Sequence, residues 1–341
     1  MKKISIVIGC YNVSEYLDRC WASLKTQTIG IENIECIFVD DASNDGGKTW
    51  EVLQRIENEA PESVMIIHSE QNGGPGGARN KGIAYAGGKY LLFLDADDEF
   101  LPNSCEKLFE LAEEKETDII QFNHIITRGE IKKVNQGPKG NTLYTIETDN
   151  DRVRFLNATT VSYGCWNKLY RMDMVKESQA VFAEKVVYEE PLFVYPMFLY
   201  AKRIYITDEV FYIYNIHEGS IVTAKIGKKL TDHPQVQLML LEYCLQRPDL
   251  FKKYSEVIEC YFLWSYYCET IMFAAQRADT VLSAEYFAQM QAICLKLFPN
   301  WRENAMIKRT PADVQELMNS LYIKIGSQQE LNDFIKHAGK L

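Results

Sequence analysis

Two aspartates one residue apart, Asp95 and Asp97, are the residues of this sequence that most directly suggest chemistry. They follow an apolar run, residues 90–94, that has the character of a buried strand. Carboxylates at a strand end can reach one ligand from a short turn, and their oxygen atoms suit Mg²⁺ or Mn²⁺ that substrate phosphates also hold. The alternative is an acidic cap for the helix expected after Pro102, a role that suits the neighbouring Asp98. The pair predicts a cation site for an anionic substrate.

A second acidic pair, Asp40 and Asp41, ends another apolar run at residues 34–39. Adjacent carboxylates at the end of a buried strand cost desolvation energy unless hydrogen-bond donors pair with them. The N–H of a uracil ring or a ribose hydroxyl would be a suitable donor. The pair therefore predicts a nucleotide contact, and an ordinary turn that starts a helix is the alternative.

A glycine-rich turn, residues 72–77, comes before a predicted helix at residues 77–86. Such turns allow close approach of the backbone to a ligand, and a helix N-terminus favours anions. Arg79 is expected on the first turn of that helix, where its guanidinium could meet a phosphate. The spacing matches neither the dinucleotide-binding fingerprint nor the Walker A loop. A plain strand-to-helix connection is the alternative.

An alternating strand–helix pattern in residues 1–100 must position these motifs. The apolar runs are at residues 4–9, 34–40, 64–69 and 90–95, and the helical stretches between them are at 13–27, 47–60 and 77–86. This alternation predicts a mostly parallel sheet with helices on both faces, which binds ligands beyond the carboxyl ends of its strands. The acidic pairs should therefore converge on one crevice with Tyr11 and Asn12, which follow the first strand.

The pattern changes after residue 100. Strands are expected at 118–124 and 210–215, a helix at 191–200, and a hairpin of 131–134 with 142–146 around residues 137–138. From about residue 228 onward only helices are predicted, and the boundary between the two parts is expected at 222–228.

The helical tail contains an aromatic cluster that cannot all face one side of a helix. Its members are Tyr261, Phe262, Trp264, Tyr266 and Tyr267. We expect the tail to fold as a helical subdomain that packs on the preceding domain and helps to present an acceptor. Peripheral contact with a membrane is the alternative.

Composition excludes several classes of protein. The 341 residues carry a formal net charge of −10 and are 47% hydrophobic, which fits a folded protein without the basic face of a nucleic-acid binder. Nine cysteines without a Cys-x-x-Cys pair suggest reduced thiols. Residues 4–8 are too short an apolar run for a signal peptide, and no run of about 18 uncharged apolar residues suggests a membrane span. We expect a cytoplasmic protein, with the inner face of the membrane as an alternative location.

Several stretches occur together in the order and spacing of one known family. They are residues 6–12, 39–45, 72–74, 78–82 and 93–98. Together they resemble the family 2 glycosyltransferases, inverting enzymes of the GT-A fold. The resemblance covers residues 1–100 and continues more loosely to about 222 through 166–170, 188–193, 212–214 and 219–221. It implies an α/β fold of the GT-A type, Rossmann-like, followed by an α-helical C-terminal subdomain.

The resemblance also implies roles for individual residues. Asp40 would bind uracil, and Asp97 would be the principal metal ligand. Glu190 stands where the family usually has an aspartate as general base, and Glu189 is the alternative within that pair. The residues implied for the nucleotide sugar are Tyr11, Asn12, Asp40, Asn72, Gly73, Arg79, Asp95 and Ala96, and those implied for Mn²⁺ or Mg²⁺ are Asp97, Asp95 and His217.

The function implied is metal-dependent transfer of a sugar from a nucleotide diphosphate, with UDP as the expected nucleotide. The acceptor would be a hydroxyl of a glycan or of a lipid-linked molecule, in surface polysaccharide or glycoconjugate synthesis. Residues 1–225 would form the catalytic domain, with the nucleotide-binding part at 1–100 and the acceptor-binding part at 101–225. Residues 226–341 would form the helical C-terminal region. The alternatives are a non-catalytic nucleotide-sugar-binding module and a sugar nucleotidyltransferase, which should carry a basic glycine-rich loop at residues 10–13. The sequence names neither the sugar nor the acceptor.

Overall fold

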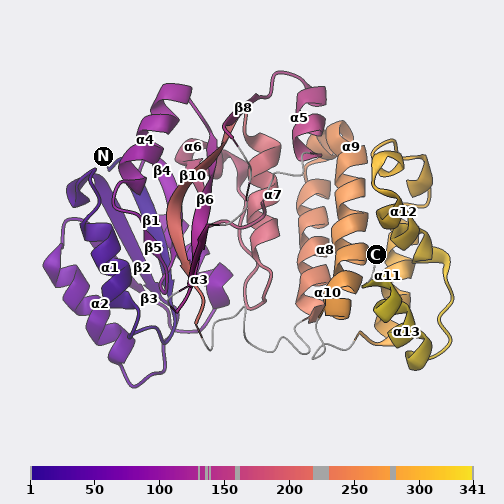
Figure 1. Cartoon of the computed structure of the whole chain (residues 1–341), viewed down its shortest axis with the longest axis horizontal. Helices are drawn as coiled ribbons and strands as arrows, with labels where there is room; N and C mark the ends of the chain where they lie inside the picture. Colours follow the sequence, from indigo (N-terminus) through magenta and orange to yellow (C-terminus); the bar gives the residue numbers. More distant parts are fainter. Residues whose placement is uncertain are drawn as a thin grey trace. The chain divides into compact units, whose positions relative to one another are not determined.

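The computed structural model describes residues 2–129, 131–134, 137, 140–157, 162–217, 230–276 and 282–339. The chain divides into two compact units, Met1–Thr223 and Ala224–Leu341. The first unit is α/β and the second is helical (Figure 1).

The described residues of the first unit form a ten-stranded sheet. Eight of its strands follow the order β3-β2-β1-β4-β9-β6-β10-β5, and the other two, β7 and β8, pair with β6 and β10. Four strands form the parallel half of the sheet, and the inner three, β1, β2 and β4, are almost continuously buried, as expected when helices cover both faces, whereas β3 at the edge is partly exposed. The four strands are β1 (Ile4–Cys10), β2 (Ile34–Asp40), β3 (Val64–His68) and β4 (Tyr90–Asp95). Their carboxyl ends lie at one edge of the sheet, and this edge carries the acidic pairs.

The other half of the sheet is mixed, so the expectation of a mostly parallel sheet holds only for β1–β4 and for the pair β6–β10. The strand β9 pairs antiparallel with both β4 and β6, and β5 pairs antiparallel with β10. The bounds are β5 (Glu99–Phe100), β6 (Ile119–Arg128), β9 (Lys168–Arg171) and β10 (Arg203–Asn215). The insertion of β9 brings residues 164–168 close to the end of β4.

The predicted hairpin was wrong. The strand β7 (Ile131–Val134) pairs with β6, and β8 (Thr142–Thr145) pairs with β10. Gly129 follows β6 with φ of +60°, a conformation that glycine adopts without strain, and this reverses the chain before the expected turn. Of that expected turn, residue 138 lies outside the described residues.

The described residues of the first unit form seven α-helices, which flank the sheet (Figure 1). They are α1 (Leu17–Lys25), α2 (Lys48–Glu59), α3 (Gly74–Tyr85), α4 (Ser104–Lys115), α5 (Asp149–Leu156), α6 (Met172–Ser178) and α7 (Glu190–Tyr200). The helix α3 packs especially close to β1, because a Cβ atom added to Gly82 would lie 2.3 Å from Val7 Cγ1. This contact fixes the helix that carries Arg79.

The second unit contains only helices among its described residues, as the sequence predicted. They are α8 (Asp232–Leu245), α9 (Pro248–Phe262), α10 (Thr270–Gln276), α11 (Ala284–Leu297), α12 (Ala312–Asn319) and α13 (Gln328–Ala338), with short 3₁₀ turns. A π-helical segment, Leu263–Glu269, joins α9 to α10. The wider turn changes the phase of the helix, and Phe262, Tyr266 and Tyr267 are all buried.

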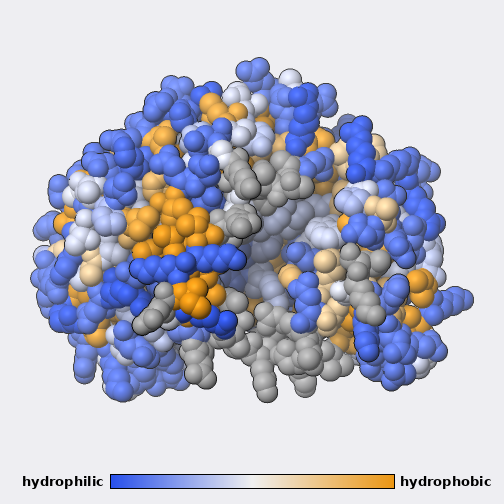
Figure 2. Space-filling view, in the orientation of Figure 1, coloured by the Kyte–Doolittle hydropathy of each residue, from blue (hydrophilic) through white to orange (hydrophobic). Residues whose placement is uncertain are grey.

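The other two members of the aromatic cluster, Tyr261 and Trp264, are half-buried. On the face shown in Figure 2, the hydrophobic areas of the second unit are small and separated by hydrophilic side chains. No helix in the described part of the chain has both the length and the hydrophobicity needed to cross a bilayer. The nine cysteines are free thiols and all are buried.

Candidate active site

The loop after β1 is tied to the loop after β2 by Asn12. Its backbone N–H donates to Ser43 Oγ at 3.0 Å, and its side-chain amide exchanges two hydrogen bonds with Asn44, at 2.7 and 2.8 Å. Asn12 has φ of +55°, a conformation that asparagine tolerates better than most residues. Tyr11 beside it is 45% exposed. The two residues therefore present an ordered, accessible edge at the end of the parallel strands.

Asp40 and Asp41 have partners within the chain. Asp40 accepts a hydrogen bond from the Ser43 amide at 3.2 Å and contacts His68 Nδ1 at 2.8 Å, and Asp41 accepts from the Gly73 amide at 2.9 Å. Both carboxylates are almost fully buried. These contacts offset the desolvation cost that led us to expect a nucleotide partner, so that cost alone does not require one.

The glycine-rich turn accommodates the chain's own backbone. A Cβ atom added to Gly76 would lie 1.9 Å from the carbonyl oxygen of Ala183, and Lys185 N donates to Gly73 O at 2.7 Å. Asn72 braces the turn by donating to the Asp41 carbonyl at 3.0 Å. The close backbone approach that the sequence predicted is thus made by the segment 183–185, which lies a few residues before the start of α7 at Glu190.

Arg79 lies on the second turn of α3, not on the first, because the helix begins at Gly74. Its guanidinium is almost buried and forms ion pairs with Asp95, at 3.0 Å, and with Glu189. An arginine fork suits such planar, two-sided pairing. Arg79 therefore joins the carboxylates at the end of β4 to those at the start of α7.

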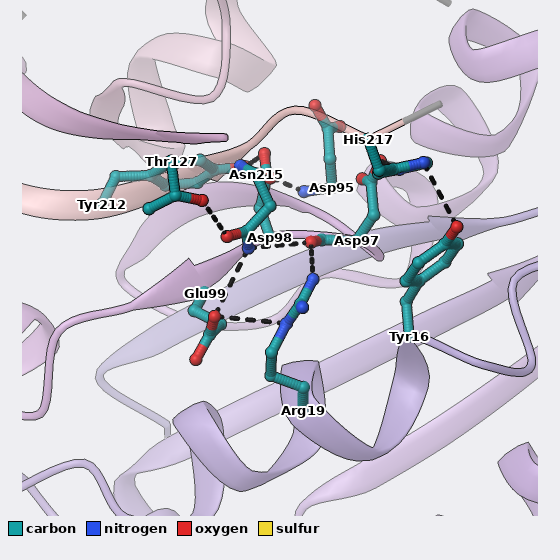
Figure 3. Close-up of polar contacts among 10 residues, drawn as sticks. All are labelled: Tyr16, Arg19, Asp95, Asp97, Asp98, Glu99, Thr127, Tyr212, Asn215 and His217. Atoms are coloured by element: carbon teal, nitrogen blue, oxygen red, sulfur yellow. Dashed lines mark hydrogen bonds and ion pairs between the residues drawn. The ribbon is translucent and has the colours of Figure 1, made fainter. Parts of the chain in front are cut away.

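Asp97 forms the centre of the cluster in Figure 3. His217 Nε2 lies 2.8 Å from Asp97 Oδ2, and the other ring nitrogen of His217 lies 3.2 Å from the hydroxyl of Tyr16. The rings of Tyr16 and His217 are stacked with centroids 4.5 Å apart. Arg19 Nη2 and Asn215 Nδ2 donate to the Asp97 carbonyl at 2.6 and 3.0 Å. The aspartate and the histidine are therefore both fixed in position, while Ala96 between the two aspartates is buried.

Asp98 is not the helix cap that the sequence suggested, because Asn103 occupies the N-cap position of α4. Its carboxyl instead accepts hydrogen bonds from Tyr212 Oη and Asn215 N, both at 2.7 Å. Burial, followed by the nearby charges of Asp95 and Asp97, raises the pKa of Asp98 to about 9. Its role is to hold the turn after β4 against β10.

A cation would fit beside Asp97. Burial first, and then the charge of Asp95, raises the pKa of Asp97, while His217 lowers it. Two adjacent ligands of an octahedral ion lie about 3 Å apart, close to the 2.8 Å between Asp97 Oδ2 and His217 Nε2. No group of three or more potential ligand side chains exists among the described residues. Phosphates and water would therefore supply the other ligands, as is usual for Mg²⁺.

Glu189 and Glu190 begin α7 but have different surroundings. Glu189 is buried and paired with Arg79, whereas Glu190 is partly exposed and accepts a hydrogen bond from the Cys165 amide at 2.7 Å. Burial and then the charge of Glu189 raise the pKa of Glu190, against the lowering effects of Arg79 and the Cys165 amide. A partly exposed carboxylate with a raised pKa is a stronger base than an ordinary glutamate side chain.

Sequence reasoning missed several residues that shape this site. Tyr16 and Arg19 are three positions apart and contact His217 and the Asp97 carbonyl respectively, but nothing in their type marked them as special. Tyr212 and Lys168 lay within stretches that supported the family resemblance, so those stretches were the available signal. The missed residues are Tyr16, Arg19, Cys165, Lys168, Tyr212 and Asn215.

Comparison with known proteins identifies the family of this chain. The family model described as glycosyl transferase family 2 matches residues 5–178, slightly more than half of the chain. EpsH of Bacillus subtilis, which has a provisional glycosyltransferase name, is 31% identical over 231 residues, covering 67% of this chain and 64% of EpsH. The poly(ribitol-phosphate) beta-glucosyltransferase of Bacillus spizizenii is 30% identical over 213 residues, covering 62% of this chain and 32% of that protein. The chain thus spans less than two thirds of each relative.

A solved structure shares the fold. The crystal structure of S. aureus TarS 1–349 in complex with UDP matches with a TM-score of 0.70 at 18% identity, covering 99% of this chain and 90% of that one. At this identity the match shows the fold alone. The fold is therefore GT-A with a helical C-terminal part, and the chain belongs to glycosyl transferase family 2.

Proposed function

We propose that this protein transfers a sugar from a UDP-sugar to an acceptor hydroxyl, with inversion at the anomeric carbon. The observation that carries this proposal is the connection of two acidic centres through Arg79. One centre, Asp97 with His217, can hold a cation, and the other, Glu190, can accept a proton. Leaving-group stabilisation and acceptor activation are the two tasks of a single-displacement sugar transfer.

Glu190 is the proposed base. Glu189 is unsuited to that role because its charge is neutralised by Arg79 in a buried ion pair. Glu190 would take the proton from the acceptor hydroxyl as the oxygen attacks the anomeric carbon from the face opposite UDP. The bond between that carbon and the diphosphate then breaks, and UDP leaves. Family membership and the raised pKa of Glu190 support this assignment.

Asp97 and His217 are the proposed protein ligands for Mn²⁺ or Mg²⁺, and Asp95 lies beside them. The cation would stabilise the negative charge that develops on the diphosphate as it leaves. Arg79 contributes indirectly, because it fixes the carboxylates of Asp95 and Glu189 at a set separation. The inner wall of the nucleoside pocket would be formed by Asp40, Asn72 and Gly73. Tyr11 and Asn12 would lie at its accessible edge.

UDP is the proposed nucleotide because the family resemblance implies it and the TarS structure of the same fold was solved with UDP. The acceptor would be a hydroxyl of a surface polymer or glycoconjugate, by analogy with a relative named for poly(ribitol-phosphate). Residues 101–225 are the proposed acceptor-binding part, and the helical region 226–341 would help to present the acceptor.

A donor screen tests this proposal. Thermal shift with a panel of nucleotide sugars and Mn²⁺ should show stabilisation by UDP and by one UDP-sugar, since a bound ligand stabilises according to its affinity. UDP release from that donor should then increase when the correct polyol or glycan acceptor is added, and NMR of the product should show the inverted anomer. Preference for a different nucleotide would reject the UDP assignment. Pyrophosphate formation from a nucleoside triphosphate and a sugar phosphate would instead indicate a nucleotidyltransferase.

A further inference from the structure

Lys168 is a fully buried lysine at the start of β9. Its Nζ donates to Gly164 O at 2.5 Å and to Asn167 Oδ1 at 2.8 Å, and it lies 5.8 Å from the centre of the Phe198 ring. None of the ion pairs found within the described ranges includes Lys168. Burying an ammonium group without a carboxylate partner is costly, and an apolar side chain of similar length would fill the same space. The cost suggests a use for the charge.

The peptide group between Gly164 and Cys165 connects Lys168 to Glu190. Its carbonyl oxygen accepts the hydrogen bond from Lys168 Nζ, and its N–H, in the same plane, donates to Glu190 Oε1 at 2.7 Å. Hydrogen bonds in a chain polarise one another, so a positive charge at the carbonyl makes the N–H a stronger donor. The Tyr170 hydroxyl donates to the Cys165 carbonyl at 3.3 Å and helps to hold this turn.

We propose that Lys168 is a positioning residue for Glu190 that acts through the Gly164–Cys165 peptide, orienting the carboxylate and stabilising its ionised form. This inference rests on the proposed role of Glu190 as the base. Lys168 touches neither the acceptor nor the donor in this mechanism. It sets the direction of one carboxylate oxygen and leaves the other available for a proton.

The charges around Glu190 determine the sign of the effect. Burial and Glu189 favour the protonated carboxyl, while Arg79 and the Cys165 amide favour the ionised form. Lys168 adds to the second group, and burial in turn lowers the pKa of Lys168 to about 7. The other titratable groups that act on or respond to Glu190 are Asp95, the Cys165 thiol, Tyr170 and Tyr214. Loss of Lys168 should therefore raise the pKa of Glu190 further.

A measurement of stability tests this without knowledge of the substrate. The raised pKa of Glu190 means that the folded protein holds a proton that the unfolded chain releases, so stability is lost as pH rises from the ordinary glutamate pKa to the raised one. Glu190→Gln lacks this loss. The difference in unfolding free energy between Glu190→Gln and wild type should therefore grow with pH and level off at the folded pKa of Glu190.

The same difference is then measured in a Lys168→Met background, where methionine keeps the length and removes the charge. Lys168 titrates in both the wild-type protein and Glu190→Gln. Its titration therefore contributes to the difference in their unfolding free energies only through its coupling to Glu190. We expect the levelling-off to move to higher pH by about one unit, a tenfold change in the protonation constant. The surface variant Lys89→Met, which removes the same charge from an ion pair with Glu113, should leave it unchanged.

Turnover provides the second readout, with the UDP-sugar that gives most UDP release in the donor screen. Lys168→Met should shift the acidic limb of the kcat profile in the same direction and lower kcat more than it changes KM. Lys168→Gln, which is neutral but can still donate to Gly164 O, should shift the acidic limb of the kcat profile less.

If Glu190→Gln is inactive but Lys168→Met leaves both pH dependences unchanged, the Lys168 inference is wrong. If Glu190→Gln remains fully active, the assignment of the base is wrong, whatever Lys168 does. Failure of both Lys168 variants to fold would show a purely structural role and overturn the proposal.

Discussion

The centres around Asp97 and Glu190 both contain carboxylates with raised pKa values, but they are held in different ways. Asp97 contacts a histidine and lies between two other acidic residues, Asp95 and Asp98, so the region has an excess of negative charge. Glu190 is held by one backbone amide, and its acidic neighbour Glu189 is neutralised by Arg79. The first arrangement favours a cation, and the second favours exchange of a proton. The same functional group, a carboxylate, is thus prepared for two tasks by its neighbours.

The largest expected effect comes from removing the proposed base. Glu190→Gln should lower kcat by roughly 10²–10⁴, the usual contribution of a general base, and leave UDP affinity with Mn²⁺ unchanged. Glu189→Gln is the matched variant and should reduce stability instead, because Arg79 loses a buried partner. Steady-state kinetics and calorimetry distinguish the two. Loss of turnover in Glu189→Gln with near-normal turnover in Glu190→Gln would exchange the roles of the two carboxylates.

Gly76→Ala should disturb the Glu190 centre and spare the Asp97 centre. The new Cβ atom would lie 1.9 Å from the Ala183 carbonyl oxygen, so the segment that leads into α7 must move. We expect a loss of about 1–3 kcal/mol in unfolding free energy, typical of overpacking, together with a lower kcat. In Gly77→Ala the nearest atom outside the helix backbone is Glu184 Cδ at 3.7 Å, an ordinary contact, so this control should fold normally. Equal unfolding free energies in urea for both variants would contradict the close approach.

Asp97→Ala should disturb the Asp97 centre and spare the Glu190 centre. It should abolish the effect of metal on UDP binding. Wild-type protein is expected to bind UDP more tightly with Mn²⁺ than with EDTA by about tenfold, or ~1.4 kcal/mol, and the variant should show no difference. Asp18→Ala removes the same charge from a surface ion pair with Arg55 and serves as the control. Calorimetry that finds equal affinity with and without metal in the wild-type protein would remove the basis for a cation site.

Tyr212→Phe should have the smallest effect. The lost hydroxyl contacts Asp98 Oδ2 at 2.7 Å and accepts from the Asp95 amide at 3.2 Å. Loss of these two hydrogen bonds should lower the unfolding free energy by about 1 kcal/mol, and the shift in Asp98 should weaken metal-dependent UDP binding slightly. Tyr214→Phe is the comparison on the same strand: the charge of Asp98 helps to raise the pKa of the Tyr214 hydroxyl, but no hydrogen bond between the two is found among the described residues. A larger loss in Tyr214→Phe would show that the turn after β4 is held elsewhere.

The sequence predicted the parts of this comparison that depend on local pattern. Apolar runs of strand length place Asp40 and Asp95 at the same edge of the sheet, because parallel strands align their carboxyl ends. The helical tail from residue 228 follows in the same way from helical periodicity. These features are set by neighbours along the chain, which a single sequence contains.

Long-range pairing was harder to predict. β7 and β8 have suitable composition for a hairpin, but each pairs with a longer strand instead, β7 with β6 and β8 with β10. Arg79 lies near the start of a helix after a glycine-rich turn, which predicted a contact with phosphate. Its partners in the structure are instead Asp95 and Glu189, which are 16 and 110 residues away in the sequence. The contact between Cys165 and Glu190 depends on the antiparallel insertion of β9, for which no local pattern was evident.

The burial of all nine cysteines has a practical consequence for spectroscopy. A thiol-reactive dye attacks the thiolate, and burial both shields these side chains and raises the pKa of groups such as the Cys165 and Cys268 thiols. A single cysteine introduced at an accessible position, such as Tyr11→Cys at the edge of the proposed donor pocket, would therefore be labelled selectively in the native protein. Fluorescence from that position would follow nucleotide binding in real time without removal of a native cysteine.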